Sequence, residues 1–227
     1  MTNDLIKINK LSKTFRSNSN NIKVLKNISL NLSKGKLIAL IGPSGSGKST
    51  FLHLIALLDK PTSGHIYICG KKTENLSEAE KNKIIRNNIS IIFQNNNLLS
   101  DFTAVENVAI PLIIRGKNYK SSVTKAKEIL GKVNLSHRLN HLPSNLSGGE
   151  QQRVAIARSL ASDTNIILAD EPTGNLDAKT TEEVFSYFLK MKQKNKTILI
   201  ATHNRELARK ADYTLRLSNG DIKETNA

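Results

Sequence analysis

A glycine-rich stretch near residue 45 has the spacing of a phosphate-binding loop. It reads Gly42-Pro43-Ser44-Gly45-Ser46-Gly47-Lys48-Ser49-Thr50, with an apolar run before it and another after it. In such a loop the glycines let backbone N–H groups surround phosphate oxygens, and the lysine reaches the β- and γ-phosphates. The hydroxyl that follows the lysine can bind Mg²⁺. We therefore expect residues 42–50 to bind ATP, with Lys48 on the phosphates and Ser49 on Mg²⁺.

Two carboxylates follow a second apolar run. Ile166-Ile167-Leu168-Ala169 leads directly into Asp170 and Glu171. Adjacent side chains at the end of a strand point in different directions, so the two acids can serve different partners. Asp170 is suited to hold Mg²⁺, and Glu171 is then free to polarise a water for attack on the γ-phosphate. On its own this pair would indicate only an acidic strand end; the phosphate loop favours the chemical interpretation.

A second glycine-rich turn lies about a hundred residues after the first. Ser147-Gly148-Gly149 precedes Glu150 and a helix-like segment. The N-terminus of a helix offers backbone N–H donors to an anion. Because one chain has one obvious place for a triphosphate, we predict that this turn covers nucleotide held by a second copy, and hence an ATP-gated dimer.

The elements that must position these residues are visible in the apolar pattern. Four continuous apolar runs predict parallel strands buried on both faces, at residues 37–41, 89–93, 166–169 and 197–201. Helical stretches at 48–58 and 178–192 would supply crossovers between them. Alternation of Ile28, Leu30 and Leu32 with polar residues predicts a half-exposed antiparallel strand. The expected fold class is α/β with a central parallel sheet.

Residues 95–161 interrupt this pattern with polar loops and helix-like segments. Within them, four apolar residues recur at three- and four-residue spacing, so one helix face is expected to be buried: Val154, Ala157, Leu160 and Ala161. We predict one domain over residues 1–227, in which 1–94 and 162–227 form the nucleotide-binding core and 95–161 form an inserted helical subdomain. A hairpin with an Asn219-Gly220 turn is expected after Tyr213, and a surface loop at residues 17–21.

The net charge of +15 raises the possibility of a nucleic-acid partner. The excess comes from 25 lysines against nine arginines, scattered along the chain, and there is no Trp with only four Tyr and six Phe. With so few aromatic side chains the chain offers no combined basic and aromatic platform for stacking bases, so we expect no nucleic acid to bind. An orientation toward acidic lipid headgroups remains open.

Other compositional features bear on location. No apolar stretch approaches eighteen residues, so no membrane span is expected, and the N-terminus lacks the pattern of a secretory leader. The one cysteine, Cys69, cannot form an internal disulfide and lies in an apparent strand, residues 65–69. These features predict a reducing, cytoplasmic location and a structural role for Cys69.

The motifs stand in the order found in the ATP-binding cassettes of ABC transporters, which the chain resembles over essentially its whole length. They are Gly42 to Thr50, Gln94, Leu146 to Arg153, Ile166 to Pro172, Asn175-Leu176-Asp177 and Thr202-His203. Leu52-His53-Leu54, residues 98–108 and residues 168–177 look most like the lipoprotein-releasing LolD family. The related MacB efflux and FtsE cell-division ATPases share Pro-Thr-Gly-Asn-Leu-Asp, so the segment after Gln94 is what favours LolD. The implied fold is a phosphate-loop NTPase (RecA-like) core with an N-terminal antiparallel β subdomain and an inserted helical subdomain.

The resemblance also implies roles for individual residues. Gln94 resembles the glutamine that senses Mg²⁺ and the attacking water. Ser147 and Gly149 would donate to a γ-phosphate bound by the opposite subunit, and Asp177 would signal across the same interface. His203 resembles the switch histidine that contacts the γ-phosphate.

Two positions fit the resemblance less closely. The family usually has Asp after the switch histidine, whereas this chain has Asn204; we expect turnover to survive because the histidine is present. An aromatic residue early in the chain commonly stacks on adenine, and Phe15 is the best-placed candidate. Packing of Phe15 in the core is the alternative.

The activity implied is ATP hydrolysis that drives separate transmembrane subunits, LolC/LolE-like, contacted through about residues 95–110. The chain would then lie peripherally on the cytoplasmic face of the bacterial inner membrane and power lipoprotein release. A MacB-type or FtsE-type complex is the alternative. A soluble cassette acting on DNA or ribosomes would carry a long coiled coil or a second cassette, and a non-catalytic regulator would lack Glu171 or His203; neither description fits this sequence.

Overall fold

The computed structural model describes residues 4–16, 21–174 and 176–225, so residues 17–20 of the loop predicted at 17–21 and the motif residue Asn175 lie outside the described residues, whereas Asn21 is the first residue of a strand. The strands are β1 (Asp4–Arg16), β2 (Asn21–Ser33), β3 (Leu37–Ile41), β4 (Ser63–Ile68), β5 (Lys71–Lys72), β6 (Ile89–Ile92), β7 (Ile166–Asp170), β8 (Thr197–Ala201), β9 (Tyr213–Ser218) and β10 (Asp221–Thr225). The helices are α1 (Lys48–Ile55), α2 (Glu78–Asn88), α3 (Ala104–Ile114), α4 (Tyr119–Lys132), α5 (Gly148–Ser162), α6 (Ala178–Gln193) and α7 (Arg205–Arg209), with short 3₁₀ turns η1 (Ser136–Arg138) and η2 (Pro143–Asn145).

A six-stranded sheet forms the centre of the molecule, in the order β10-β9-β3-β8-β7-β6. The pairs β9/β3, β3/β8, β8/β7 and β7/β6 are parallel, and only β10 runs antiparallel to its neighbour. The four apolar runs predicted as buried strands are β3, β6, β7 and β8, which confirms that part of the prediction. All residues of β7 and β8 are buried, as expected for parallel strands covered on both faces.

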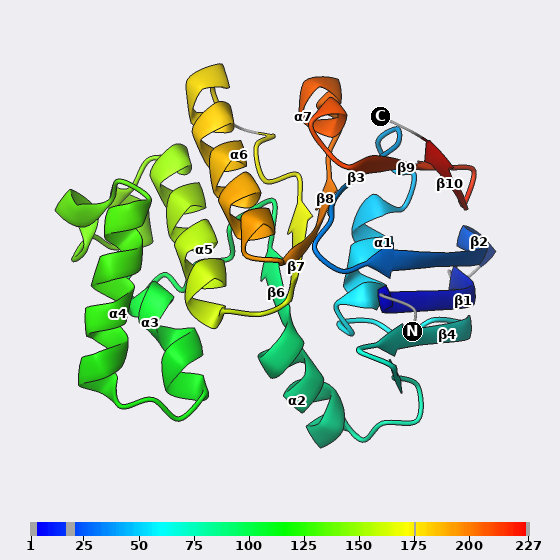
Figure 1. The fold of residues 1–227 in the computed structure, drawn as a ribbon, viewed down its shortest axis with the longest axis horizontal. Helices are drawn as coiled ribbons and strands as arrows, with labels where there is room; N and C mark the ends of the chain where they lie inside the picture. Colours follow the sequence, from blue (N-terminus) through cyan, green and yellow to red (C-terminus); the bar gives the residue numbers. More distant parts are fainter. Residues whose placement is uncertain (1–3, 17–20, 175, 226–227) are drawn as a thin grey trace.

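Alternate residues of these strands enter two separate hydrophobic cores. Ile167 and Ile198 pack on one side with residues of α3 to α6, whereas Leu168 and Leu199 pack on the other side with α1 and the second sheet. Successive side chains of a strand point to opposite faces, so this division follows from the twofold period. In Figure 1 the central sheet accordingly lies between a helical side and a second, antiparallel sheet.

The second sheet has the order β2-β1-β4-β5 and is antiparallel throughout. The predicted strand around Ile28 to Leu32 is confirmed as part of β2, with Ile28 and Leu32 buried. The strand predicted at residues 65–69 is confirmed as β4, but it ends at Ile68, so the placement of Cys69 within it was wrong. Cys69 has φ 51° and begins a turn with Gly70 at φ 76°, and its side chain is exposed.

The helix predicted at 48–58 is shorter in the structure, where α1 ends at Ile55. Leu57 adopts the left-handed conformation at φ 60°, which a leucine enters only when other contacts compensate, and this ends the helix. The other crossover, α6, matches its predicted range closely. The predicted hairpin is also confirmed: β9 and β10 join through Asn219 at φ 52° and Gly220 at φ 82°, as a two-residue turn of this kind requires.

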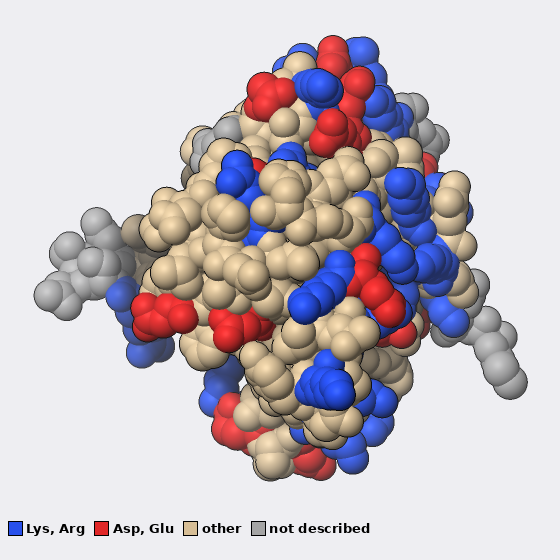
Figure 2. Space-filling view, turned by 90° about the vertical axis from the view of Figure 1, so that its left-hand side faces the viewer, with Lys and Arg blue, Asp and Glu red and all other residues tan. Residues whose placement is uncertain are grey.

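Between residues 95 and 161 the chain forms α3, α4, η1, η2 and α5. In α5, Val154, Ala157 and Ala161 are buried and Leu160 is partly buried against the same core, so the predicted apolar face is confirmed. Figure 2 shows the side of the molecule that carries these helices. Acidic and basic side chains are interspersed there around a broad uncharged area.

Asn107 holds the segment that leads into α3. Its side chain is fully buried, and its Oδ1 accepts from the Leu99 N–H at 2.9 Å. Its Nδ2 donates to the carbonyl oxygens of Leu99, Phe102 and Thr103 at 3.1, 2.9 and 3.1 Å. The Leu99 and Thr103 carbonyl oxygens also accept from the N–H groups of Phe102 and Asn107. The amide is therefore the partner of the Leu99 N–H and the Phe102 carbonyl, and backbone groups are costly to leave unpaired.

Replacing Asn107 with Ala should lower the free energy of unfolding by about 2–4 kcal/mol, because the Leu99 N–H and the Phe102 carbonyl lose the partner that the buried amide supplies. Urea denaturation measures this, and limited proteolysis should show faster cleavage within residues 98–103. Asn87→Ala, on the exposed face of α2, is the matched control and should change stability by less than about 0.5 kcal/mol. Equal stabilities for the two variants would contradict the role assigned to the Asn107 amide.

Candidate functional site

The loop between β3 and α1 has the backbone form of an anion cradle. Gly45 and Gly47 have φ values of 73° and 103°, and a Cβ at Gly47 would lie 2.5 Å from Val24 Cγ1. No side chain caps the N-terminus of α1. The first backbone N–H groups of that helix are thus available to phosphate oxygens, and the helix dipole favours a negative charge there.

Lys48 is the first residue of α1, and its side chain turns back over the loop. The residue is 8% exposed, and its Nζ donates to the carbonyl oxygens of Gly42 at 3.0 Å and Pro43 at 3.2 Å. The same ammonium lies 4.0 Å from Glu171 Oε1. The positive charge is therefore fixed between the loop and the carboxylates that follow β7.

Asp170 is the last residue of β7, Glu171 follows it, and both line the same cavity. Asp170 is 8% exposed, and its Oδ1 is buried without a hydrogen-bond partner among the described residues. A buried unpaired carboxylate oxygen is costly unless a cation neutralises it. Since Ser49 and Gln94 border the same cavity as Asp170, this set of oxygen ligands fits Mg²⁺.

Glu171 meets His203, which follows β8. Glu171 Oε2 lies 2.9 Å from His203 Nδ1 and accepts a longer hydrogen bond of 3.4 Å from the His203 N–H. The backbone of Glu171 is left-handed at φ 44°, and its N–H donates to the carbonyl oxygen of Ala201 at 2.9 Å. Because β7 and β8 are adjacent and parallel, their ends bring these two side chains together.

One cavity of about 570 Å³ joins most of the predicted site residues. Its lining consists of Val24, Ser44, Gly45, Gly47, Lys48, Ser49, Thr50, Gln94, Asp170, Glu171 and His203. Gly42 and Pro43 border a neighbouring cavity together with His203. The Ser46 hydroxyl is buried beside Gly42 and has no hydrogen-bond partner in the described part of the chain. Val24 was not among the predicted residues, because no motif surrounds it and it reaches the loop only through the position of β2.

Phe15 does not line this cavity and lies on β1. It pairs with Ile22 of β2, two residues before Val24, which lines the cavity; the pairing of β1 with β2 shifts register between Lys13 and Thr14. Phe15 is 43% and Ile22 57% exposed. The ring is therefore not buried in the core, which was the alternative considered for it, and its stacking on adenine remains a prediction.

The second glycine-rich turn lies elsewhere in the chain. Ser147 and Gly148 are exposed at the start of α5, and a Cβ added at Gly149 would lie 3.3 Å from Thr180 Cγ2 in α6. Asp177 begins α6, where its carboxylate accepts from the Thr180 N–H at 3.0 Å. Two helix N-termini thus lie side by side on the surface, and none of these residues borders the phosphate-loop cavity of the same chain.

Hydrogen bonds fix the geometry of this turn. The Glu150 N–H donates to Ser147 Oγ at 3.2 Å, and Glu150 Oε2 accepts from the Ser147 N–H at 2.8 Å, which completes a capping box. Glu150 Oε1 also accepts from Arg138 Nε at 2.8 Å. The Ser147 N–H and the Arg138 guanidinium together hold the pKa of Glu150 below its usual value despite its burial.

Asn204 replaces the expected Asp without losing the local structure. Its Oδ1 accepts from the N–H groups of Glu206 at 2.9 Å and Leu207 at 3.2 Å, so it caps α7. Asn and Asp are equally good at this position. The backbone that carries His203 is therefore still anchored by the following helix.

Comparison with known proteins bears on the family. The model of the ABC transporter family matches residues 25–174. The lipoprotein-releasing system ATP-binding protein LolD of Rickettsia bellii is 49% identical over 98% of this chain and 99% of its own length. The protein of the same name from Nitrobacter hamburgensis is 42% identical over 97% and 95%.

Solved structures agree in fold. A dimeric ATP-binding cassette in a post-hydrolysis state, bound to ADP and Pi, is 40% identical with a TM-score of 0.93, over 97% of this chain and 98% of that one. These matches confirm the fold and the family expected from the sequence. The chain belongs to the ATP-binding cassette family of ABC transporters, as an ATP-hydrolysing protein of the LolD type.

Proposed function

We propose that this chain is the ATP-hydrolysing subunit of an ABC transporter that releases lipoproteins from the bacterial inner membrane. The observation that carries the hydrolytic part is the cavity shared by Lys48, Asp170, Glu171 and His203. The cargo is inferred from the name of relatives that are 42–49% identical over nearly the whole chain. A MacB-type or FtsE-type complex is the competing assignment, and the membrane partner distinguishes them.

Binding of the triphosphate falls to the phosphate loop. The uncapped N–H groups at the start of α1 donate to phosphate oxygens, and the Lys48 ammonium leaves its two carbonyl partners for the β- and γ-phosphates. Bound Mg²⁺ would be held by Ser49 and Asp170, with Gln94 beside it, and would neutralise charge on the β- and γ-phosphate oxygens.

Hydrolysis requires a base next to the γ-phosphate. Glu171 accepts a proton as a water oxygen bonds to the γ-phosphorus and the bond from that phosphorus to the bridging oxygen breaks, releasing ADP and phosphate. His203 contacts the Glu171 carboxylate at 2.9 Å, so it orients the base and is placed to donate to the γ-phosphate. Both roles of His203 are part of this proposal, and the Glu171→Gln variant below tests the base that His203 contacts.

The second half of each site comes from another copy of the chain. Ser147, Gly148 and Gly149 present helix N–H donors outward, away from the cavity of their own chain, and Asp177 lies next to them. Facing a second copy, these groups would cover the γ-phosphate held there. In this arrangement the core, residues 1–94 and 162–227, holds nucleotide, and the helical part, residues 95–161, supplies the covering turn.

The membrane partner would bind the segment before and within α3. Leu99 and Phe102 are 46% and 42% exposed, although Asn107 holds the backbone that carries them. Among the described residues, no helix has the length and apolarity needed to cross a bilayer. We therefore assign residues 95–110 to the contact with LolC/LolE-like transmembrane subunits, with the chain peripheral on the cytoplasmic face.

Glu171→Gln should leave ATP binding intact and slow hydrolysis by at least about 100-fold, since the amide cannot accept the proton from water. ATP that is not hydrolysed should then hold two copies together, which gel filtration with ATP and Mg²⁺ detects as a dimer. Glu182→Gln, on the exposed face of α6, is the control and should behave as the unmodified chain. A Glu171→Gln variant that hydrolyses ATP normally would remove the base assignment.

Mixing two inactive variants tests whether sites are shared. In a mixed dimer of Lys48→Ala and Ser147→Ala chains, both defects fall in one site and the other site is intact. Random pairing should restore about a quarter of full activity, because half the dimers are mixed and each has one good site.

Loss of the Ser147 cap could itself weaken α5, so Ser147→Asn, which retains a capping side chain, should be tested in the same way. Recovery with both Ser147 variants supports sharing. If neither mixture hydrolyses ATP above the separate variants, the two-chain site is wrong.

Phe102→Asp should abolish co-purification of the transmembrane subunits from detergent while leaving ATP-dependent dimerisation unchanged, because a charge cannot be buried at an apolar contact without a partner. Tyr119→Asp, at an exposed aromatic of α4 that is 61% exposed, is the control. Mass spectrometry of the proteins retained by the unmodified chain identifies the complex. Recovery of efflux or cell-division subunits in place of lipoprotein-releasing ones would overturn the cargo assignment.

A further inference from the structure

Lys13 of β1 has three partners for its ammonium. The side chain is only 11% exposed, and Nζ donates to Asp59 Oδ1 at 2.7 Å and to the carbonyl oxygen of Lys60 at 2.8 Å. The ammonium also lies 4.9 Å from the centre of the Phe15 ring. A largely buried ammonium held by two oxygens has a fixed position, and a cation at this distance is attracted to the face of an aromatic ring.

The cation therefore occupies one face of the Phe15 ring. The ring remains 43% exposed, and Ile22 beside it is 57% exposed. Among the described residues these two large apolar side chains are thus partly open to solvent, on β1 and β2, and Val24 of β2 lines the phosphate-loop cavity. Such a surface suits a flat aromatic ligand on the face of the ring away from Lys13.

The Asp59–Thr62 segment that holds Lys13 is itself anchored to β1. The Thr14 N–H donates to Thr62 Oγ1 at 2.9 Å, and the Thr62 N–H donates to the carbonyl oxygen of Ser12 at 2.9 Å. Asp59 Oδ1 also accepts from the Lys60 N–H at 2.7 Å. These bonds flank Lys13 on both sides, so the ammonium and the strand that carries Phe15 cannot move independently.

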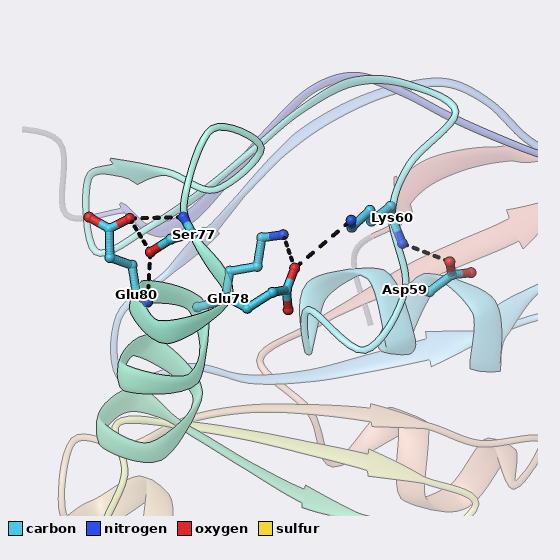
Figure 3. Close-up of polar contacts among 6 residues, drawn as sticks. Asp59, Lys60, Ser77, Glu78 and Glu80 are labelled. Carbon is cyan, nitrogen blue, oxygen red and sulfur yellow. Dashed lines mark hydrogen bonds and ion pairs between the residues drawn. The ribbon is translucent and has the colours of Figure 1, made fainter.

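Figure 3 shows how this segment continues toward α2. Lys60 Nζ lies 3.9 Å from Glu78 Oε1, which also pairs with Lys81 at 3.0 Å, and Ser77 and Glu80 cap the helix. Lys60 and Glu78 are 81% and 75% exposed, so their ion pair contributes little. Residues 59–62 are therefore held mainly by their hydrogen bonds to β1, and only weakly by the ion pair with α2.

Residues 59–62 follow closely after α1, whose first residue is Lys48. The helix thus connects the phosphate loop to the segment that fixes Lys13. A helix of eight residues is about 12 Å long and does not stretch, so it keeps the two ends of the nucleotide site at a constant separation. Through α1, the position of the phosphate loop is coupled to the position of Lys13 and the Phe15 ring.

We propose that Lys13 is a positioning residue for nucleobase recognition: held by Asp59 and the Lys60 carbonyl, it occupies the inner face of Phe15 and leaves the outer face to stack on the base. This inference rests on the proposed ATP site. If Lys13 only stabilised the fold through its ion pair, its removal would affect ligands with and without a base alike. If it positions Phe15 for the base, its removal should weaken only the binding of ligands that carry a base.

The test compares ATP with inorganic tripolyphosphate, which carries similar phosphate chemistry and no base. Lys13→Met keeps the aliphatic stem but removes the charge, and it should weaken ATP binding about 3- to 10-fold while changing tripolyphosphate binding by less than about 2-fold. Lys13→Arg, which retains a cation for both Asp59 and the ring, should recover most of the ATP affinity. Lys7→Met, at an exposed lysine of the same strand, should affect neither ligand.

A double-mutant cycle with Phe15→Ala completes the experiment. Once the ring is absent, Lys13→Met should cause no further loss of ATP affinity, because its effect acts through Phe15. Equal loss for both ligands, or an undiminished loss in the Phe15→Ala background, would overturn the positioning role. Normal ATP binding by Lys13→Met would also overturn the positioning role, but it would not contradict the proposed ATP site. If instead the unmodified chain binds neither ligand, the proposed function itself fails.

Discussion

The alignment of three parallel strands is the constraint on which the rest of the site depends. β3, β8 and β7 are neighbours and point the same way, so the residues that follow them meet at one edge of the sheet. At this edge lie the phosphate loop after Ile41, Asp170 and Glu171 at the end of β7, and His203 after β8. Each strand is buried on both faces, and shifting its register by one residue would turn the side chains of one core into the other. Burial of apolar side chains in the two cores thus fixes the strand register, and with it the positions of the residues at the strand ends that line the cavity.

Much of this arrangement could be predicted, because its signals are local. Continuous apolar runs mark buried parallel strands, and the phosphate-loop residues are contiguous, as are Asp170 and Glu171. β1 was harder to see. Register shifts at Ile8–Leu11 and Leu11–Lys13, with Lys10 at φ 49°, interrupt its alternation. The end of α1 was missed because nothing in Ala56-Leu57-Leu58 predicts a left-handed leucine. Contacts such as Val24 to Gly47 or Lys13 to Asp59 join distant segments, and only the folded pairing brings them together.

The two glycine-rich turns differ in what surrounds them. The first is enclosed by β2, the ends of β7 and β8, and Lys48, so its N–H groups face a cavity. The second begins α5 at the surface, next to the start of α6, and is fixed by Glu150 and Arg138 from its own helical region. Its donors are ordered before any anion arrives, which lowers the entropy cost of binding one. A preorganised donor set that faces outward fits a ligand carried by another molecule.

The backbone conformation of Glu171 is unfavourable by itself, but it places the carboxylate in contact with two other side chains. A left-handed backbone at φ 44° costs a non-glycine residue about 1–2 kcal/mol. The hydrogen bond from its N–H to Ala201 and the contacts of its carboxylate with His203 and Lys48 offset that cost. In a regular extension of β7 the side chain would continue the strand's alternation, and it would not lie between a lysine and a histidine from two other elements. Strain of this kind persists where the surrounding structure determines the conformation. The turn is therefore held by contacts of the carboxylate with Lys48 and His203, the two side chains beside it in the proposed hydrolysis step, so the shape of the strand end is coupled to the chemistry proposed for it.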